Sequence, residues 1–213
     1  MPETNIASGM SAWERHDWAT AYEQLLPLLD AEESEPGHLE ALAASAWWCG
    51  SLDDAIAAQE RAFKIYSAAG RNVDAAGLAI DLAEEHAMRL QPSAARGWMA
   101  RASRLLEDEP TTPALGNLRR LEAVFAADSE SGLQEALELA LQVEEIGRDT
   151  GDRDVEVLGL HDQGRFSIAA GDVGRGMALM EESMVSVLTG ELGPRVTGRI
   201  LCNMIDISAS MAD

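Results

Sequence analysis

The sequence predicts an all-α fold, a right-handed α-solenoid of about eleven helices arranged in antiparallel pairs. A short signature recurs five times, in which a bulky or turn-forming residue and two further residues precede an Ala or Gly that opens an apolar run. The closing small residues lie 34 to 41 positions apart: Ala21, Ala55, Ala95, Ala136 and Gly176. The chain has only two Tyr and three Phe, and few β-branched residues, so strands are disfavoured.

A second small residue precedes each of these by twelve or thirteen positions. The earlier residues are Gly9, Ala43, Ala83, Ala123 and Gly164. Small side chains at the closest approach of two antiparallel helices permit a short distance between the helix axes. We therefore expect the two small residues of each pair to face each other. The spacing of thirteen in the fourth pair indicates one extra residue in its loop.

The first pair of helices is expected to begin at Thr4 or Asn5, either of which can cap a helix. This helix runs to about Arg15. His16-Asp17 then forms a tight turn into a second helix, which ends near Asp30.

An acidic stretch over 30–37 separates the first pair from the second, because Pro36-Gly37 breaks helices and like charges repel. Gly50 is suited to a left-handed C-cap. Ser51 or Asp53 can cap the helix that follows.

The later pairs are separated by the same kinds of residue, with Pro92 fitting the first turn of a helix and Gly171 a C-cap. The stretch 107–113 is the clearest break in the chain. The later helices are expected at 38–49, 52–69, 74–91, from Pro92 onward, and at 113–127, 131–149, 153–170, 172–189 and 195–211. The repeat units of a single solenoid domain are about 3–35, 36–72, 73–110, 111–151, 152–192 and a partial 193–213.

The last helix carries an apolar face with no following helix to cover it. Its members are Leu201, Met204, Ile205 and Ile207. A repeat buries its apolar face against its neighbour, so we expect the chain to be the N-terminal part of a longer protein. The alternative is that the lone helix is itself the cap. An uncovered face would also favour a homodimer through 195–211.

The charge balance is strongly acidic, with 16 basic and 37 acidic residues and a net charge of −21. Binding to nucleic acid or to an anionic membrane needs Lys and Arg facing phosphates, so we expect this segment to bind neither. The acidity suits a basic partner, although a solvated acidic face is the simpler interpretation. Two cysteines, Cys49 and Cys202, and an N-terminus without a signal-peptide pattern predict a reduced, cytoplasmic protein.

Patterns typical of catalysis or metal binding are weak. The four histidines lack metal-ligand spacing, and we expect no metal, no cofactor and no enzymatic activity. The run 149–154 (DTGDRD) is superficially similar to a calcium loop, but it lacks the closing Glu and is better interpreted as helix capping. The glycines over 171–176 follow a predicted helix rather than a strand, so close packing explains them better than dinucleotide binding.

Small residues twelve apart, in segments that place Leu before the first of them, resemble the tetratricopeptide repeat (TPR) in its divergent, MalT-like form. The segments that carry the resemblance are Leu39-Leu42-Ala43 and Ala79-Leu82-Ala83. The later repeats are longer than 34 residues, and no proline closes each unit. The resemblance implies a binding scaffold built from helix pairs.

Two further segments, 171–184 (GDVGRGMALMEESM) and 193–203 (GPRVTGRILCN), resemble the helical-repeat region of bacterial LuxR-type transcription regulators. They are also similar to related proteins that couple such repeats to cyclase or ATPase domains. In LuxR-type regulators the repeats form a sensory or scaffolding region, and a separate C-terminal helix-turn-helix domain binds DNA. The resemblance implies that this chain is the interaction region of such a regulator.

Tryptophans indicate where a partner would bind. Trp13 and Trp47 each lie four residues after a small residue, on first helices that line the inner surface in TPR-like repeats, and Trp48 follows directly. With neighbouring residues they would outline a groove for a peptide or small ligand. The candidates are Met10, Trp13, Glu14, Glu40, Trp47, Trp48, Glu84, Arg120, His161 and Arg165. The alternative is that these tryptophans pack between repeats, as expected for Trp18 and Trp98.

The sequence therefore predicts a non-catalytic module that binds a protein, a peptide or a small effector. The favoured context is a LuxR-type regulator. The alternative is a free-standing TPR-like scaffold or adaptor for a protein complex.

Overall fold

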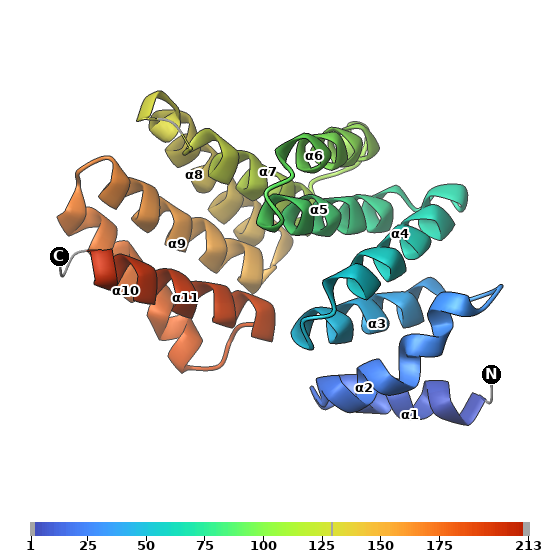
Figure 1. The fold of residues 1–213 in the computed structure, drawn as a ribbon. Helices are drawn as coiled ribbons and strands as arrows, with labels where there is room; N and C mark the ends of the chain where they lie inside the picture. The colour runs from blue at the N-terminus through green and yellow to red at the C-terminus, as the bar shows by residue number, and fades with distance from the viewer. Residues whose placement is uncertain (1–2, 129, 211–213) are drawn as a thin grey trace. The chain divides into compact units, whose positions relative to one another are not determined.

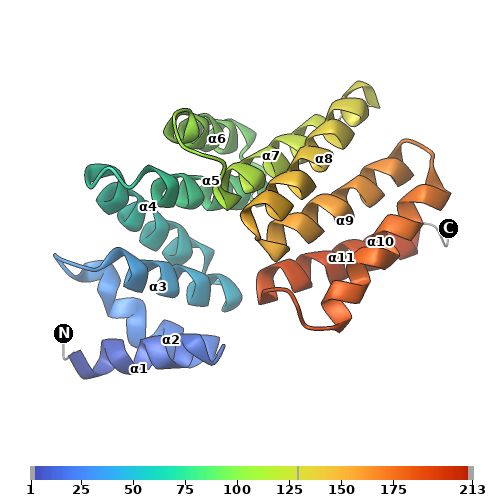
Figure 2. The same cartoon turned by 180° about the vertical axis from the view of Figure 1, so that it is seen from behind.

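The computed structural model describes residues 3–128 and 130–210, and Figures 1 and 2 show that this part of the chain is all-helical. It contains eleven α-helices and no strand, which confirms the predicted fold class. The helices are α1 (Glu3–Glu14), α2 (Trp18–Leu25), α3 (Pro36–Trp48), α4 (Leu52–Ala68), α5 (Asn72–Met88), α6 (Pro92–Leu106), α7 (Pro113–Ala126), α8 (Leu133–Thr150), α9 (Arg153–Ala169), α10 (Val173–Leu188) and α11 (Pro194–Ser210). Two short 3-10 segments, η1 (Leu26–Asp30) and η2 (Glu130–Gly132), complete the set.

The helices form two compact units, which meet in sequence at the predicted break over 107–113. The first unit ends at Glu109 and contains α1 to α6, while the second begins at Pro110 and contains α7 to α11. Within each unit every helix packs against the next one along the chain. Each unit is therefore a short stack of antiparallel helices with its own interior.

The recurring signature marks the start of each second helix. Its first residues are also the first residues of α2, α4, α6, α8 and α10: Trp18, Leu52, Pro92, Leu133 and Val173. The paired small residues are buried in every pair. In the fourth pair, η2 lies between α7 and α8, in agreement with the longer loop that the spacing predicts.

The pair Gly164 and Gly176 shows why these positions are small. A Cβ on Gly176 would lie 2.6 Å from the Gly164 carbonyl oxygen, and a Cβ on Gly164 would lie 2.9 Å from the Gly176 carbonyl oxygen. Real Cβ atoms do not approach backbone so closely, so α9 and α10 require glycine at both positions. The prediction that the small residues face each other is confirmed here.

A second close approach, between α8 and α9, is not predicted by the repeat. A Cβ on Gly147 would lie 2.1 Å from the Glu156 amide nitrogen, and one on Gly159 would lie 2.3 Å from the Glu144 amide nitrogen. These glycines join one helix pair to the next. The spacing of twelve reports contacts within pairs only, so it carries no signal for them.

Helix ends follow the predicted chemistry at several glycines, but Ser51 makes no side-chain capping bond, and α3 begins at Pro36, within the expected break over 30–37. Gly50 and Gly171 have φ of 78° and 92°, as expected for left-handed C-caps. Over 149–154, Gly151 ends α8 with φ of 70°, and the Asp152 carboxylate accepts from the Val155 amide at 3.0 Å to begin α9. The capping interpretation of this segment is therefore confirmed.

Two predictions about the first pair are wrong. The helix α1 begins at Glu3, so Thr4 and Asn5 lie inside it rather than capping it. The second helix of the pair does not stay α-helical to Asp30, because Pro27 has no amide proton for the helix hydrogen bond and η1 takes over at Leu26.

The last helix covers part of its apolar face within its own unit. Val196 and Ile200 pack with Val157 and Leu158 of α9, and Met204 lies against this cluster. The expectation that Met204 is uncovered is therefore wrong. Two residues of the predicted face, Leu201 and Ile205, are exposed.

Candidate functional site

Most of the predicted groove residues of the first unit lie near the C-terminal ends of first helices. This group contains Met10, Trp13, Glu14, Trp47, Trp48 and Glu84. Glu14 is exposed, Trp48 is 37% exposed, and the other four are half-buried. The rings of Trp47 and Trp48 meet edge to face, with centroids 5.0 Å apart.

Glu40 lies apart from this group, near the start of α3. Its carboxylate accepts a hydrogen bond from the Tyr66 hydroxyl, and the Arg71 guanidinium lies 4.3 Å from the centre of the Tyr66 ring. Burial, together with the hydrogen bond to Glu40, raises the pKa of Tyr66 to about 12. Glu40 therefore holds the end of α4 and is not brought to the tryptophans.

Trp18 belongs to an aromatic stack that the sequence does not predict. His16 lies parallel to Trp18 with centroids 4.9 Å apart, and Trp18 lies parallel to Trp48 at 5.7 Å. His16 is exposed and Trp18 half-buried. The stack joins the turn between α1 and α2 to the end of α3. Trp98, by contrast, meets Phe63 edge to face at 5.1 Å between α4 and α6, as expected of a structural residue.

A shallow pocket of about 440 Å³ adjoins the stack at the turn between α3 and α4. It is lined by the segment 50–54 and by Arg89 at the end of α5. Arg89 Nη2 lies 2.7 Å from Asp53 Oδ1, and the Tyr22 hydroxyl donates to Asp54 Oδ2 at 2.5 Å. This hydrogen bond to the Asp54 carboxylate raises the pKa of Tyr22.

Two predicted groove residues of the second unit are buried. Arg120 is 4% exposed and His161 is fully buried. Arg120 Nε lies 3.1 Å from Asp162 Oδ2, and Arg165 Nη1 donates to Asp162 Oδ1 at 2.9 Å. Arg120 and His161 therefore belong to the interior and cannot line an open groove. Only Arg165, which is half-buried, reaches the surface.

Asp162 is the centre of this cluster. Burial alone would raise the pKa of its carboxyl, but the guanidinium groups of Arg120 and Arg165 outweigh burial and hold the pKa below its usual range. The carboxylate therefore stays ionised inside the unit. The sequence gives no sign of this, because a carboxylate beside His161 on a helix normally faces water.

His161 is a neutral, fully bonded core histidine. The Ser183 hydroxyl donates to the Met180 carbonyl, so its oxygen accepts the Nδ1 proton of His161 at 3.1 Å. Nε2 then accepts from the Asn203 amide at 3.3 Å. Burial, with some repulsion from the nearby guanidinium groups, lowers the pKa of His161 to about 4.

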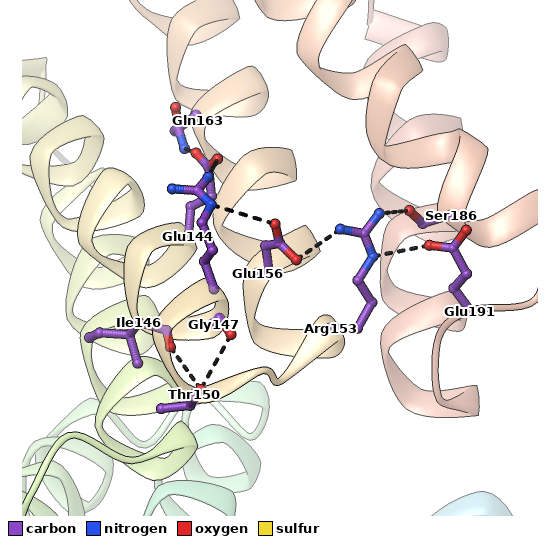
Figure 3. Close-up of polar contacts among 10 residues, drawn as sticks. Glu144, Ile146, Gly147, Thr150, Arg153, Glu156, Gln163, Ser186 and Glu191 are labelled. Carbon is purple, nitrogen blue, oxygen red and sulfur yellow. Dashed lines mark hydrogen bonds and ion pairs between the residues drawn. The ribbon is translucent and has the colours of Figure 1, made fainter.

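A chain of polar contacts runs from α8 through α9 to α10 in the second unit (Figure 3). Gln163 donates to Glu144 at 2.7 Å, and Arg148 joins Glu144 to Glu156. Arg153 in turn bonds Glu156 at 2.8 Å and reaches Ser186 and Glu191 at 2.8 and 3.0 Å (Figure 3). Alternating charges neutralise one another along it, so it holds helices together rather than binding a ligand.

Metal binding and membrane insertion find no support in the described part of the chain. No group of three or more His, Cys, Asp or Glu there could hold a metal ion. No helix within the described ranges is long and apolar enough to cross a membrane.

Comparison with known proteins shows the fold but no family. No protein-family model matches the chain, and no curated protein matches it. A solved variant of a Podosopora anserina protein assigned as a kinesin light chain, with nearly identical TPR-like repeats, is 17% identical with a TM-score of 0.59. That match covers 89% of this chain and 96% of the other.

BtubC (BKLC) from P. vanneervenii is also 17% identical with a TM-score of 0.59, and the match covers 87% of this chain and 80% of that one. At this level of identity the likeness shows the fold alone. The chain therefore has a TPR-like fold of stacked helix pairs, and these structures give no support to a LuxR-type regulator.

Proposed function

We propose that this chain is a cytoplasmic, non-catalytic module that binds a protein or peptide. The TPR-like fold supports this, because stacked helix pairs present an extended surface without a closed reaction site. The single observation that carries the proposal is the group of tryptophans and carboxylates at the ends of first helices in the first unit. Trp48 in particular keeps over a third of its surface exposed, and exposed tryptophans are typical anchors of protein interfaces.

The test is photo-crosslinking in the cells that make the protein. A photoreactive residue at exposed Glu14 should capture a defined partner, and the same residue at exposed Lys64 on α4, a second helix, should not. Trp47→Ala in the Glu14-labelled protein should abolish the capture. If both positions give the same adducts, or neither gives any, the groove is not the binding surface.

For the cellular context we propose the interaction region of a LuxR-type transcription regulator. The support is the resemblance of 171–184 and 193–203, together with an acidic composition that suits a partner other than DNA. A small effector is a second class of ligand for this role. The alternative is a free-standing scaffold or adaptor for a protein complex, which the TPR-like fold supports equally.

The reading frame beyond codon 213 distinguishes these two contexts. A helix-turn-helix domain downstream would support the regulator. A stop codon at that point would support the scaffold and overturn the regulator.

A further inference from the structure

Seven helix ends in the described part of the chain close by the same backbone arrangement. In each, a residue with positive φ follows the helix, and the next amide donates to the carbonyl five residues earlier. Five of these positions are glycine: Gly50, Gly70, Gly151, Gly171 and Gly190. The other two are His16 and Leu90, with φ of 60° and 57°.

A side chain at such a position costs stability. The left-handed conformation disfavours residues with a Cβ relative to glycine, because the Cβ then lies too close to the backbone. The Leu90 side chain does not offset this cost by burial, because it is 87% exposed. His16 is also exposed. Backbone strain that the fold does not need is commonly kept where function needs the side chain.

Both unusual residues lie on one continuous edge of the first unit. His16 stacks on Trp18, and Trp18 on Trp48. Trp48 lies two residues before the pocket segment 50–54. Asp53 of this segment pairs with Arg89, the residue before Leu90. We call this surface, formed by His16, Trp18, Trp48, Asp53, Arg89 and Leu90, the turn edge.

The turn edge combines ring faces and apolar side chains with carboxylates. Asp53 keeps 91% of its side chain exposed despite its ion pair with Arg89. Asp54 lies in the same pocket, and Asp17 follows His16 in the first turn. The neighbouring Met88 adds a further exposed apolar side chain.

We propose that the turn edge binds a protein segment that carries an arginine beside large apolar residues. A guanidinium is planar, stacks on tryptophan and pairs with a carboxylate in a forked geometry. The pocket lining already includes one such pair, since Arg89 and Asp53 both line it and form an ion pair. Exposed Leu90 and Met88 would cover the apolar neighbours of the arginine.

Arginine fits this surface better than the other charged side chains. A lysine ammonium is strongly hydrated and makes neither the stacked nor the forked contact. A carboxylate would meet Asp17, Asp53 and Asp54 and be repelled. This inference goes beyond the proposed groove, because its deciding residues, Asp53 and Leu90, are not groove residues.

The test uses the full chain and two peptides of equal charge, acetyl-Leu-Arg-Leu-Arg-Leu-amide and its lysine counterpart. Binding is followed by the five tryptophan indole signals in nuclear magnetic resonance spectra. The arginine peptide should bind about three- to ten-fold more tightly than the lysine peptide, as expected for a stacked cation. It should shift the signals of Trp18 and Trp48 rather than that of Trp98.

Variants separate the turn edge from general acidity. Asp53→Asn should weaken binding of the arginine peptide about three-fold or more. Asp74→Asn, at the opposite end of α5 where Asp74 pairs with Arg71, should change it little. Leu90→Gly should weaken binding while leaving the free energy of unfolding unchanged or higher, because glycine relieves the backbone strain.

Several outcomes would overturn the proposal. Equal affinities for the two peptides, or equal effects of Asp53→Asn and Asp74→Asn, would mean general attraction to an acidic protein. Absence of binding would also refute it. Since the groove is tested by crosslinking at Glu14 and by Trp47→Ala, either idea can fail while the other stands.

Discussion

At the scale of single residues, the interior of the second unit depends on Asp162. Its carboxylate lies between the guanidinium groups of Arg120 and Arg165. A buried ion pair need not add net stability, but removal of one partner leaves the other charge unpaired. Removal of the Asp162 carboxylate is therefore expected to cost more stability than its ion pairs add to the folded protein.

We expect Asp162→Asn to lower the free energy of unfolding by about 3–5 kcal/mol, because it removes the buried carboxylate that pairs with both Arg120 and Arg165. Chemical denaturation measures the change. The control is Asp74→Asn, which removes a half-exposed pair and should cost less than about 1 kcal/mol. Equal losses in the two variants would contradict the importance of the buried cluster.

His161 predicts a pH dependence of stability. Its pKa is about 4 in the folded protein and near the ordinary 6.5 in the unfolded protein. Between these two pH values the imidazole is protonated in the unfolded state but neutral in the folded state. Stability should fall as the pH drops from about 6.5 to 4, by about 3 kcal/mol. His161→Gln, which can still donate to Ser183 and accept from Asn203, should lose this contribution. Identical pH profiles for the two proteins would contradict a neutral buried histidine.

At the scale of helices, stacking depends on close backbone contacts within pairs and between them. Gly164 and Gly176 join α9 to α10, whereas Gly147 and Gly159 join α8 to α9. A neighbouring side chain that rotates away would not make room for a Cβ, because backbone atoms lie within 2.9 Å of the added Cβ at all four positions. These glycines therefore set the helix spacing of the second unit.

Gly159→Ala should destabilise the protein by about 3 kcal/mol or more, because its Cβ would lie 2.3 Å from the Glu144 amide nitrogen. Gly174→Ala in α10 is the matched control, since a Cβ there meets nothing within 4 Å. It should leave stability unchanged or raise it by up to about 1 kcal/mol through helix propensity. Thermal unfolding followed by circular dichroism compares them, and similar melting temperatures would refute the close approach.

The exposed side of α11 predicts self-association. Ile205 is 70% exposed and Leu201 is also exposed, and covering large apolar side chains gains about 1.5–3 kcal/mol each. We expect light scattering to show a homodimer that Leu201→Glu with Ile205→Glu converts to a folded monomer. Val173→Glu, at an exposed apolar position of α10, should leave the dimer intact. A parent chain that stays monomeric at high concentration would exclude this interface.

At the scale of the whole molecule, the two units offer separate spectroscopic signals. All five tryptophans lie in the first unit, so their fluorescence reports only on that unit. Circular dichroism reports the helices of both units. Because each unit has its own core, a change inside one should be felt mainly there.

We therefore expect Asp162→Asn to divide the denaturation curve into two transitions. The part seen by circular dichroism alone should shift to lower denaturant, while the tryptophan transition should stay in place. If both signals shift together by the same amount, the units unfold as one cooperative body and the expectation fails.

The sequence by itself determined the all-helical class, the order of the helices and, to within two residues, the start of each second helix. These follow from local chemistry, namely helix period, caps and the small residues of each pair. Gly151 and Asp152 show this well, since one ends a helix and the other begins the next within six residues of sequence. Among the candidate groove residues, the structure brings Trp47 and Trp48 into contact and places Glu40 with Tyr66 instead.

Only the tertiary structure decided which faces of the helices meet. Arg120 and Asp162 are 42 positions apart, and Trp18 and Trp48 are 30 positions apart, so neither contact leaves a periodic trace in the sequence. The burial of Arg120 and His161 depends on which faces of α7 and α9 pack against neighbouring helices. His16 and Leu90 carried a local signal, as residues with side chains where the other turns have glycine. Their common edge, however, exists only because helix packing brings the α1–α2, α3–α4 and α5–α6 turns together.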